Sequence, residues 1–112
     1  MKKLLYIGAL LLAGNVAAES SEEARSALIE HGCVTCHEIP GANGANGLTG
    51  PPLTAMHRQV YIAGVVPNNF ETLTNFIRNP QAIDPRSAMP KLSITRSQAE
   101  AIARFLLSAE GS

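Results

Sequence analysis

The most informative stretch of this 112-residue sequence is Cys33-Val34-Thr35-Cys36-His37. Two thiols separated by two residues on a tight, helix-like turn can reach the two vinyl groups on one edge of a porphyrin and form thioethers. The imidazole of the next residue is then carried under the ring, where it can bind iron. The spacing therefore predicts one covalent c-type haem, attached through Cys33 and Cys36, with His37 as an iron ligand.

A Cys-x-x-Cys pair also occurs in redox disulfides and in zinc sites. A disulfide exchanger is expected beside a strand-helix-strand pattern, which this sequence lacks. A zinc site needs further ligands, and only His31 and His57 remain as extra candidates because there is no second Cys pair. We favour haem and keep both alternatives as testable rivals.

The N-terminus has the pattern of a secretory signal peptide. Two lysines are followed by an apolar run over residues 4–16, and small residues at 16–18 form a cleavage site. The apolar run is short for a membrane span. We therefore expect residues 1–18 to be a signal peptide and 19–112 to be one periplasmic domain, with membrane attachment only if the segment is not cleaved.

The net charge argues against nucleic-acid binding, and the low aromatic content is consistent with a haem in the core. The whole chain has 9 basic and 9 acidic residues, so loss of Lys2 and Lys3 leaves 7 against 9, a net charge of −2. A mildly acidic domain lacks the basic face that nucleic-acid binding requires. Only 4% of residues are aromatic and there is no Trp, so a haem would supply much of the core.

Helical periodicity predicts three main helices. The first follows Ser20, which has capping-box spacing to Glu23, and ends at Gly32. The second starts after the N-cap Asn69 and stops before Pro80. A third starts at a Thr95/Gln98 capping box, and residues 54–61 form a possible short helix. The expected apolar faces are Ala24, Ala27, Leu28 and His31; Phe70, Leu73, Phe76 and Ile77; and Ala99, Ile102, Ala103 and Leu106.

Small residues on the first and last helices allow these two helices to cross closely. Arg96, Glu100 and Arg104 lie on the other side of the last helix at i, i+4 and i+8. We interpret this charged set as a solvated face and not as a binding site.

Two loops supply further candidate residues. Residues 38–50 are rich in Gly, Asn and Pro and lead into Gly50-Pro51-Pro52-Leu53. An iron-bound imidazole is usually oriented by a hydrogen bond from its other ring nitrogen to a carbonyl, and Pro51 is our candidate acceptor for His37. The prolines alternatively serve only to turn the chain.

The second loop, residues 79–92, contains three prolines and Met89-Pro90. A haem bound by His on one face commonly takes a thioether on the other in electron carriers. Met89 is therefore the expected sixth ligand. Met56, which we expect to pack beside the haem, and His57, expected to be exposed or to touch a propionate, are the rivals.

Together these residues resemble the class I c-type cytochromes. The early haem signature, Gly50-Pro51-Pro52-Leu53, Met89-Pro90 and a closing helix are shared with that class. The run over residues 67–83 is similar to the cytochrome c domain of bacterial cytochrome oxidase subunit II. The resemblance implies an all-α, small cytochrome c fold of three to five helices around one haem c, with crossing N- and C-terminal helices. It also implies His37 and Met89 as proximal and distal ligands.

One departure from the resemblance concerns the haem propionates. Many relatives have a Trp in the middle helix where this chain has Phe76, and a Phe cannot donate a hydrogen bond. Arg58, Gln59 and Tyr61 are possible substitutes.

We therefore expect a non-enzymatic, exported monohaem carrier of single electrons, with redox partners such as a terminal oxidase or a periplasmic dehydrogenase. The alternatives are a dedicated electron-transfer subunit of such a dehydrogenase, or a haem enzyme or gas sensor with a labile sixth ligand.

Overall fold

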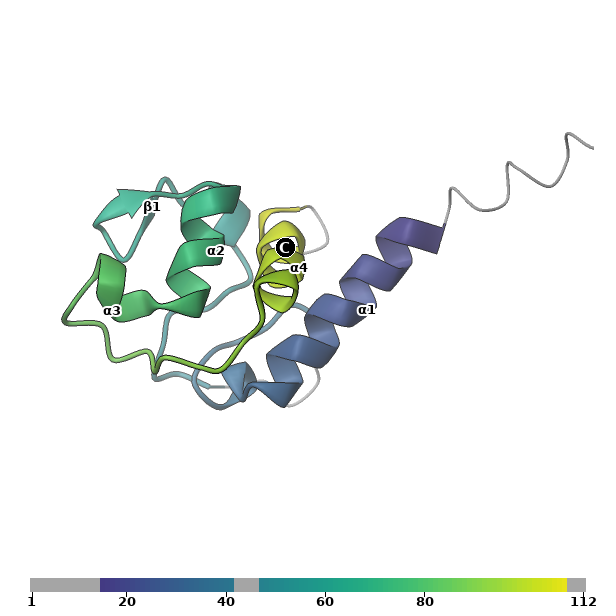
Figure 1. Cartoon of the computed structure of the whole chain (residues 1–112), viewed down its shortest axis with the longest axis horizontal. Helices are drawn as coiled ribbons and strands as arrows, with labels where there is room; N and C mark the ends of the chain where they lie inside the picture. The colour runs from purple at the N-terminus through teal and green to yellow at the C-terminus, as the bar shows by residue number, and fades with distance from the viewer. Residues whose placement is uncertain (1–14, 42–46, 109–112) are drawn as a thin grey trace, which may run out of the picture.

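The computed structural model describes residues 15–41 and 47–108, and its elements form a small helical body (Figure 1). Residues 1–14 of the predicted signal peptide and 42–46 of the predicted loop lie outside the described residues. In chain order the elements are α1 (Asn15–Glu30), the 3-10 turns η2 (Cys33–Thr35) and η3 (Met56–Arg58), β1 (Tyr61–Ile62), β2 (Val66–Pro67), α2 (Phe70–Arg78), α3 (Pro80–Ile83) and α4 (Arg96–Leu107).

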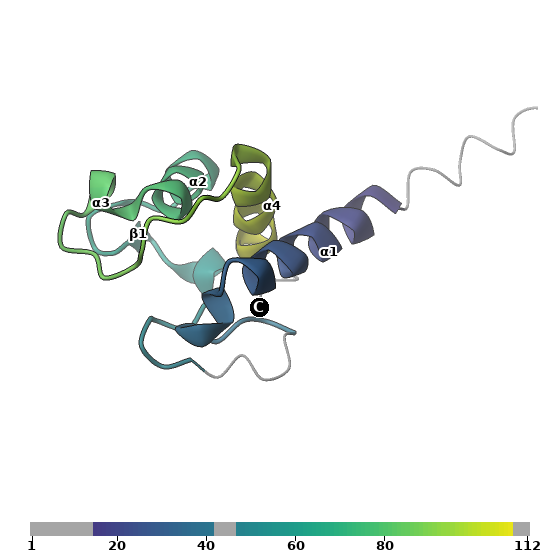
Figure 2. The same ribbon diagram turned by 60° about the horizontal axis from the view of Figure 1, so that its bottom comes forward.

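Helix α4 lies between α1 and α2 and packs against both of them (Figures 1 and 2). Ala24 on α1 and Ala99 and Ala103 on α4 are each 0% exposed, so the terminal helices approach closely where side chains are smallest. The predicted crossing of the N- and C-terminal helices is confirmed. Because α4 has a neighbour on each side, Ala101 and Phe105 are buried as well as its predicted apolar face.

A polar contact between α1 and α4 is built on Gln98. Its side-chain oxygen accepts hydrogen bonds from the Thr95 backbone N–H at 3.2 Å and from His31 Nε2 at 3.0 Å. Its amide nitrogen donates to Glu30 Oε2 at 3.2 Å. The predicted Thr95/Gln98 capping box is therefore present, and the same side chain also ties α4 to the end of α1.

Helix α2 begins and ends as the sequence predicts. Asn69 caps it by accepting from the Thr72 backbone N–H at 3.0 Å, and Leu73 and Ile77 are buried. The prediction that Phe70 belongs to the buried face is wrong, because Phe70 is 39% exposed. Its ring lies under the guanidinium of Arg104 at 5.1 Å, a cation–π contact, so Arg104 is not merely solvated.

Three predicted elements need correction. Helix α1 begins at Asn15, before Ser20, because the residues preceding Ser20 also favour helix. Residues 54–61 contain only the turn η3, and Tyr61 belongs to the antiparallel hairpin of β1 and β2, which the sequence analysis missed. The predicted loop 79–92 contains the short helix α3, which has Pro80 at a first-turn position where a missing N–H costs nothing.

No helix in the described part of the chain is both long enough and apolar enough to cross a membrane.

Replacement of Gln98 by Ala removes the capping partner of Thr95 and both bonds to α1. Since three hydrogen bonds are lost and each contributes about 1 kcal/mol net, we expect the free energy of unfolding to fall by about 2–4 kcal/mol in guanidinium titrations. The control is Gln59→Ala, at an exposed glutamine whose side chain makes no hydrogen bond within the described residues. Equal stability of the two variants would show that the Gln98 contacts contribute nothing.

Candidate haem site

The Cys-x-x-Cys-His stretch forms a tight turn at the end of α1. Gly32 ends the helix with a left-handed φ of 73°, a conformation that favours glycine, and η2 follows at once. The backbone N–H groups of Cys36 and His37 both donate to the Cys33 carbonyl, at 3.3 and 3.0 Å. The turn thus has the helix-like geometry that the spacing predicts for two thiols on one edge of a ring.

Both cysteines are free thiols and half-buried. Cys33 packs against the hydrophobic core formed by the helices. Burial raises the pKa of the Cys33 thiol above its ordinary value, and this effect outweighs a hydrogen bond that lowers it. Both thiols are therefore free for covalent attachment, and that of Cys33 lies beside apolar side chains.

The imidazole of His37 is oriented by Pro51. His37 Nδ1 lies 2.6 Å from the Pro51 carbonyl oxygen, and because a carbonyl can only accept, Nδ1 carries the proton. In the neutral imidazole the other nitrogen, Nε2, is then the unprotonated one and can bind a metal ion. The hydrogen bond expected from the sequence is therefore present, and the ligand role of His37 stays a prediction.

Two glycines let the following loop pass directly against the turn. A Cβ at Gly50 would lie 2.7 Å from His37 Nδ1 and 2.9 Å from Nε2, so no side chain fits there without moving the imidazole. A Cβ at Gly47 would lie 2.6 Å from the backbone nitrogens of Cys36 and His37. The Gly50 N–H also donates to the Cys36 carbonyl at 2.7 Å. These contacts fix the loop that presents Pro51.

Met89 lies in the segment between α3 and α4 and is half-buried. The side-chain amide of Gln81, on α3, donates to the Met89 carbonyl at 2.5 Å and to the Ser87 carbonyl at 3.0 Å. The Met89 N–H donates to Ser87 Oγ at 3.2 Å. The segment is therefore held by hydrogen bonds as well as by its prolines, which is what a thioether ligand on a flexible side chain requires.

Met56 and His57, the other candidates for the sixth ligand, differ from each other in burial. Met56 is 9% exposed and belongs to the core, in agreement with a packing role. His57 is half-buried rather than exposed, and its Nδ1 is buried without a partner among the described residues. The other half of its prediction, a contact with a propionate, stays a prediction. Arg58, Gln59 and Tyr61 are exposed, and their predicted contacts with propionates stay predictions.

The zinc alternative finds no support in the geometry. No group of three or more His, Cys, Asp or Glu side chains that could hold a metal ion occurs among residues 15–41 and 47–108. His31, one of the two extra candidates, instead bonds to Gln98.

The residues around the turn fit a covalent haem. Two free thiols would hold the vinyl edge, and His37 offers a lone pair on Nε2 because Nδ1 is engaged. The glycine-lined loop holds that imidazole against rotation. The Gly47 and Gly50 contacts and the role of Gln81 were not predicted from the sequence. The position of Gln81, directly after the helix-starting Pro80, was the available signal for it.

Comparison with known proteins agrees with this site. The chain is 30% identical over 89 residues to cytochrome c oxidase subunit 2 of Alkalihalophilus pseudofirmus, in a match that covers 79% of this chain and 25% of that protein. This chain therefore spans about a quarter of the length of that relative. The family model for cytochrome c matches residues 21–110, which include the Cys33–His37 turn, Pro51 and Met89. The chain belongs to the cytochrome c family, as the resemblance in its motifs predicted.

Proposed function

We propose that this protein is an exported monohaem cytochrome c that carries single electrons between redox proteins and is not itself an enzyme. The observation that carries the proposal is the His37 imidazole, held through Nδ1 by Pro51 with Nε2 left for iron, directly beside two free thiols. Membership of the cytochrome c family supports a haem-based electron carrier.

When bound, haem c supplies the one-electron Fe(II)/Fe(III) couple. Within the chain, Cys33 and Cys36 would hold the group, and His37 and Met89 would bind its iron. A thioether favours the reduced state, so Met89 raises the reduction potential relative to a second histidine. The Gln81 bonds to the Met89 segment favour a fixed sixth ligand over the labile one that a haem enzyme or gas sensor needs.

The partners we propose are a terminal oxidase or a periplasmic dehydrogenase that meets the carrier transiently. Redox encounters bury little surface, typically below about 1,200 Å², which allows rapid exchange. The 30% identity to cytochrome c oxidase subunit 2 supports an oxidase as one partner class.

Met89→Leu tests the distal ligand because leucine keeps the volume but has no sulfur. We expect the oxidised protein to lose its thioether-to-iron charge-transfer band and its reduction potential to fall. The matched control is Met56→Leu, which changes a core methionine at a cost below about 1.5 kcal/mol and keeps the band. Loss of the band in Met56→Leu alone would assign the ligand to Met56, and a high-spin wild-type spectrum would remove the electron-carrier proposal.

Gly50→Ala tests the fit of the proximal side. The added methyl group would overlap the His37 ring, so we expect a severalfold lower yield of haem-loaded protein, measured by haem absorbance per protein mass. In the control, Gly64→Ala, the methyl group meets nothing within 4 Å. Gly64→Ala should lower the free energy of unfolding by about 1–2 kcal/mol because φ is positive at this position, but it should leave haem loading unchanged. Equal loading of both variants would show that the loop does not constrain the imidazole.

The export proposal rests on residues 1–18. Cleavage after Ala18 would shorten α1 and leave Ser20 and Glu23 in the first turn, where their capping-box spacing suits a helix start. We expect the mature protein from the periplasmic fraction to begin at Glu19, as mass spectrometry of its N-terminal peptide would show. A full-length chain in the membrane fraction would instead indicate an uncleaved anchor.

A further inference from the structure

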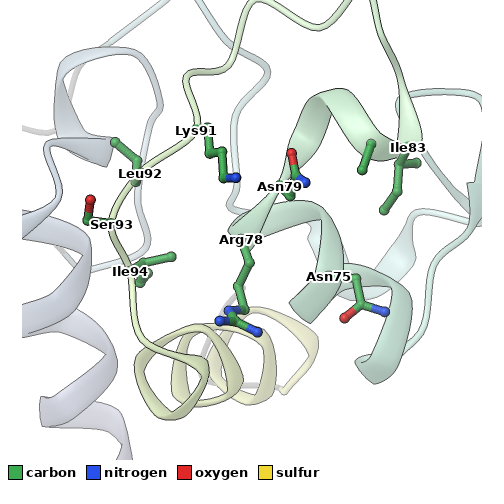
Figure 3. A pocket seen from close by; sticks show the side chains of 9 residues that line it. Asn75, Arg78, Asn79, Ile83, Lys91, Leu92, Ser93 and Ile94 are labelled. Carbon is green, nitrogen blue, oxygen red and sulfur yellow. The ribbon is translucent and has the colours of Figure 1, made fainter.

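A cavity of about 560 Å³ lies between α2, α3 and residues 91–94, the segment that follows Met89 (Figure 3). Its size is within the range of roughly 300–1,000 Å³ typical of small-molecule sites. None of the proposed haem residues Cys33, Cys36, His37 and Met89 lines it. It therefore lies outside the set of residues proposed to hold the haem.

The lining is rich in hydrogen-bond donors and has no acidic residue among the described residues. Five polar side chains contribute to it, namely Asn75, Arg78, Asn79, Lys91 and Ser93. None of these five side chains has a hydrogen bond or an ion pair within the part of the chain that the structure describes. The remaining lining residues are apolar, namely Ala82, Ile83, Leu92 and Ile94.

Arg78 is the strongest individual indication of a ligand. Its Nε atom is buried and has no partner among the described residues, a costly arrangement for a charged donor. Figure 3 shows its guanidinium extending from α2 towards α4, while Lys91 extends from the facing segment towards Asn79. A guanidinium presents paired donors that match a carboxylate or a phosphate, and an ammonium adds a second positive charge.

The acidic residue on the neighbouring helix does not neutralise these cations. Glu100 on α4 is engaged by Arg96 at 3.8 Å and by Arg104 at 3.5 Å. The two cations of the cavity are thus left without an ion pair in the described structure.

We propose that this cavity binds a small organic anion that carries phosphate or carboxylate groups. Arg78 and Lys91 bind its charged groups, the amides of Asn75 and Asn79 and the Ser93 hydroxyl bind its oxygens, and the apolar lining contacts its carbon atoms. The binding does not depend on the electron-carrier proposal, because no haem residue takes part in it.

The proposed anion site adjoins the segment that carries Met89, the proposed distal ligand. Lys91 is two residues after Met89, and Asn79 is two residues before Gln81, which donates to the Met89 carbonyl. An anion bound by both sides therefore restrains the segment that carries Met89.

The test is an NMR titration of the haem-loaded, reduced protein with sodium pyrophosphate, and separately with sodium succinate, at constant ionic strength. We expect saturable shifts confined to the cavity, including the side-chain amides of Asn75 and Asn79. Saturation by pyrophosphate alone identifies a phosphate ligand, by succinate alone a carboxylate, and by both a general dianion site.

Arg78→Gln and Lys91→Gln should each weaken binding by about tenfold, the loss expected for one charged hydrogen bond. Lys91 is exposed, so its variant tests the site even where Arg78→Gln fails to fold. Arg86→Gln is the matched control, because it removes the same charge from an exposed arginine outside the cavity and should bind within about twofold of wild type. Absence of saturable shifts with either anion, or equal weakening by Arg86→Gln, would overturn the proposal.

Discussion

The hydrogen bond from His37 Nδ1 to the Pro51 carbonyl is the constraint on which the proposed haem site depends. At 2.6 Å it sets both the tautomer and the orientation of the imidazole, so that Nε2 is the nitrogen available to iron. It can form only because the loop before Pro51 passes directly over the turn, where Gly47 and Gly50 have no Cβ to obstruct it. A turn, two glycines and a proline that are separate features of the sequence therefore act as one unit.

Helix α4 connects the part of the chain that carries His37 with the part that carries Met89, the proposed distal ligand. The Cys33–His37 turn follows α1, whereas the Met89 segment is held by Gln81 on α3 and continues into α4. Because α4 packs against both α1 and α2, close contacts between small side chains such as Ala24, Ala99 and Ala103 set how these two parts of the chain are arranged. The helical core thus supports, on rigid elements, the two segments that carry the proposed ligands His37 and Met89.

Features encoded by local chemistry could be predicted from the sequence. Four local features follow from a few neighbouring residues each: the tight turn at Cys33–His37, the Asn69 cap, the Thr95/Gln98 capping box and the Pro51 contact. What the prediction missed depends on tertiary contacts or on very short elements. The hairpin has strands of two residues, too short for any alternation to be detected. Phe70 has helical spacing typical of a core residue, yet it is exposed and its ring contacts the guanidinium of Arg104 on another helix. The close approach of Gly50 to His37 likewise depends on how the loop folds back.

The central claim is that His37 and Met89 bind the same iron atom, which makes the protein a carrier of single electrons. The most direct measurement is an NMR spectrum of the reduced, haem-loaded protein with ¹³C-labelled methionine methyl groups. A methyl group held against the haem face is shifted far outside the ordinary methionine range by the ring current. Our account predicts that shift for Met89 and not for Met56. An ordinary position for the Met89 methyl group would contradict it.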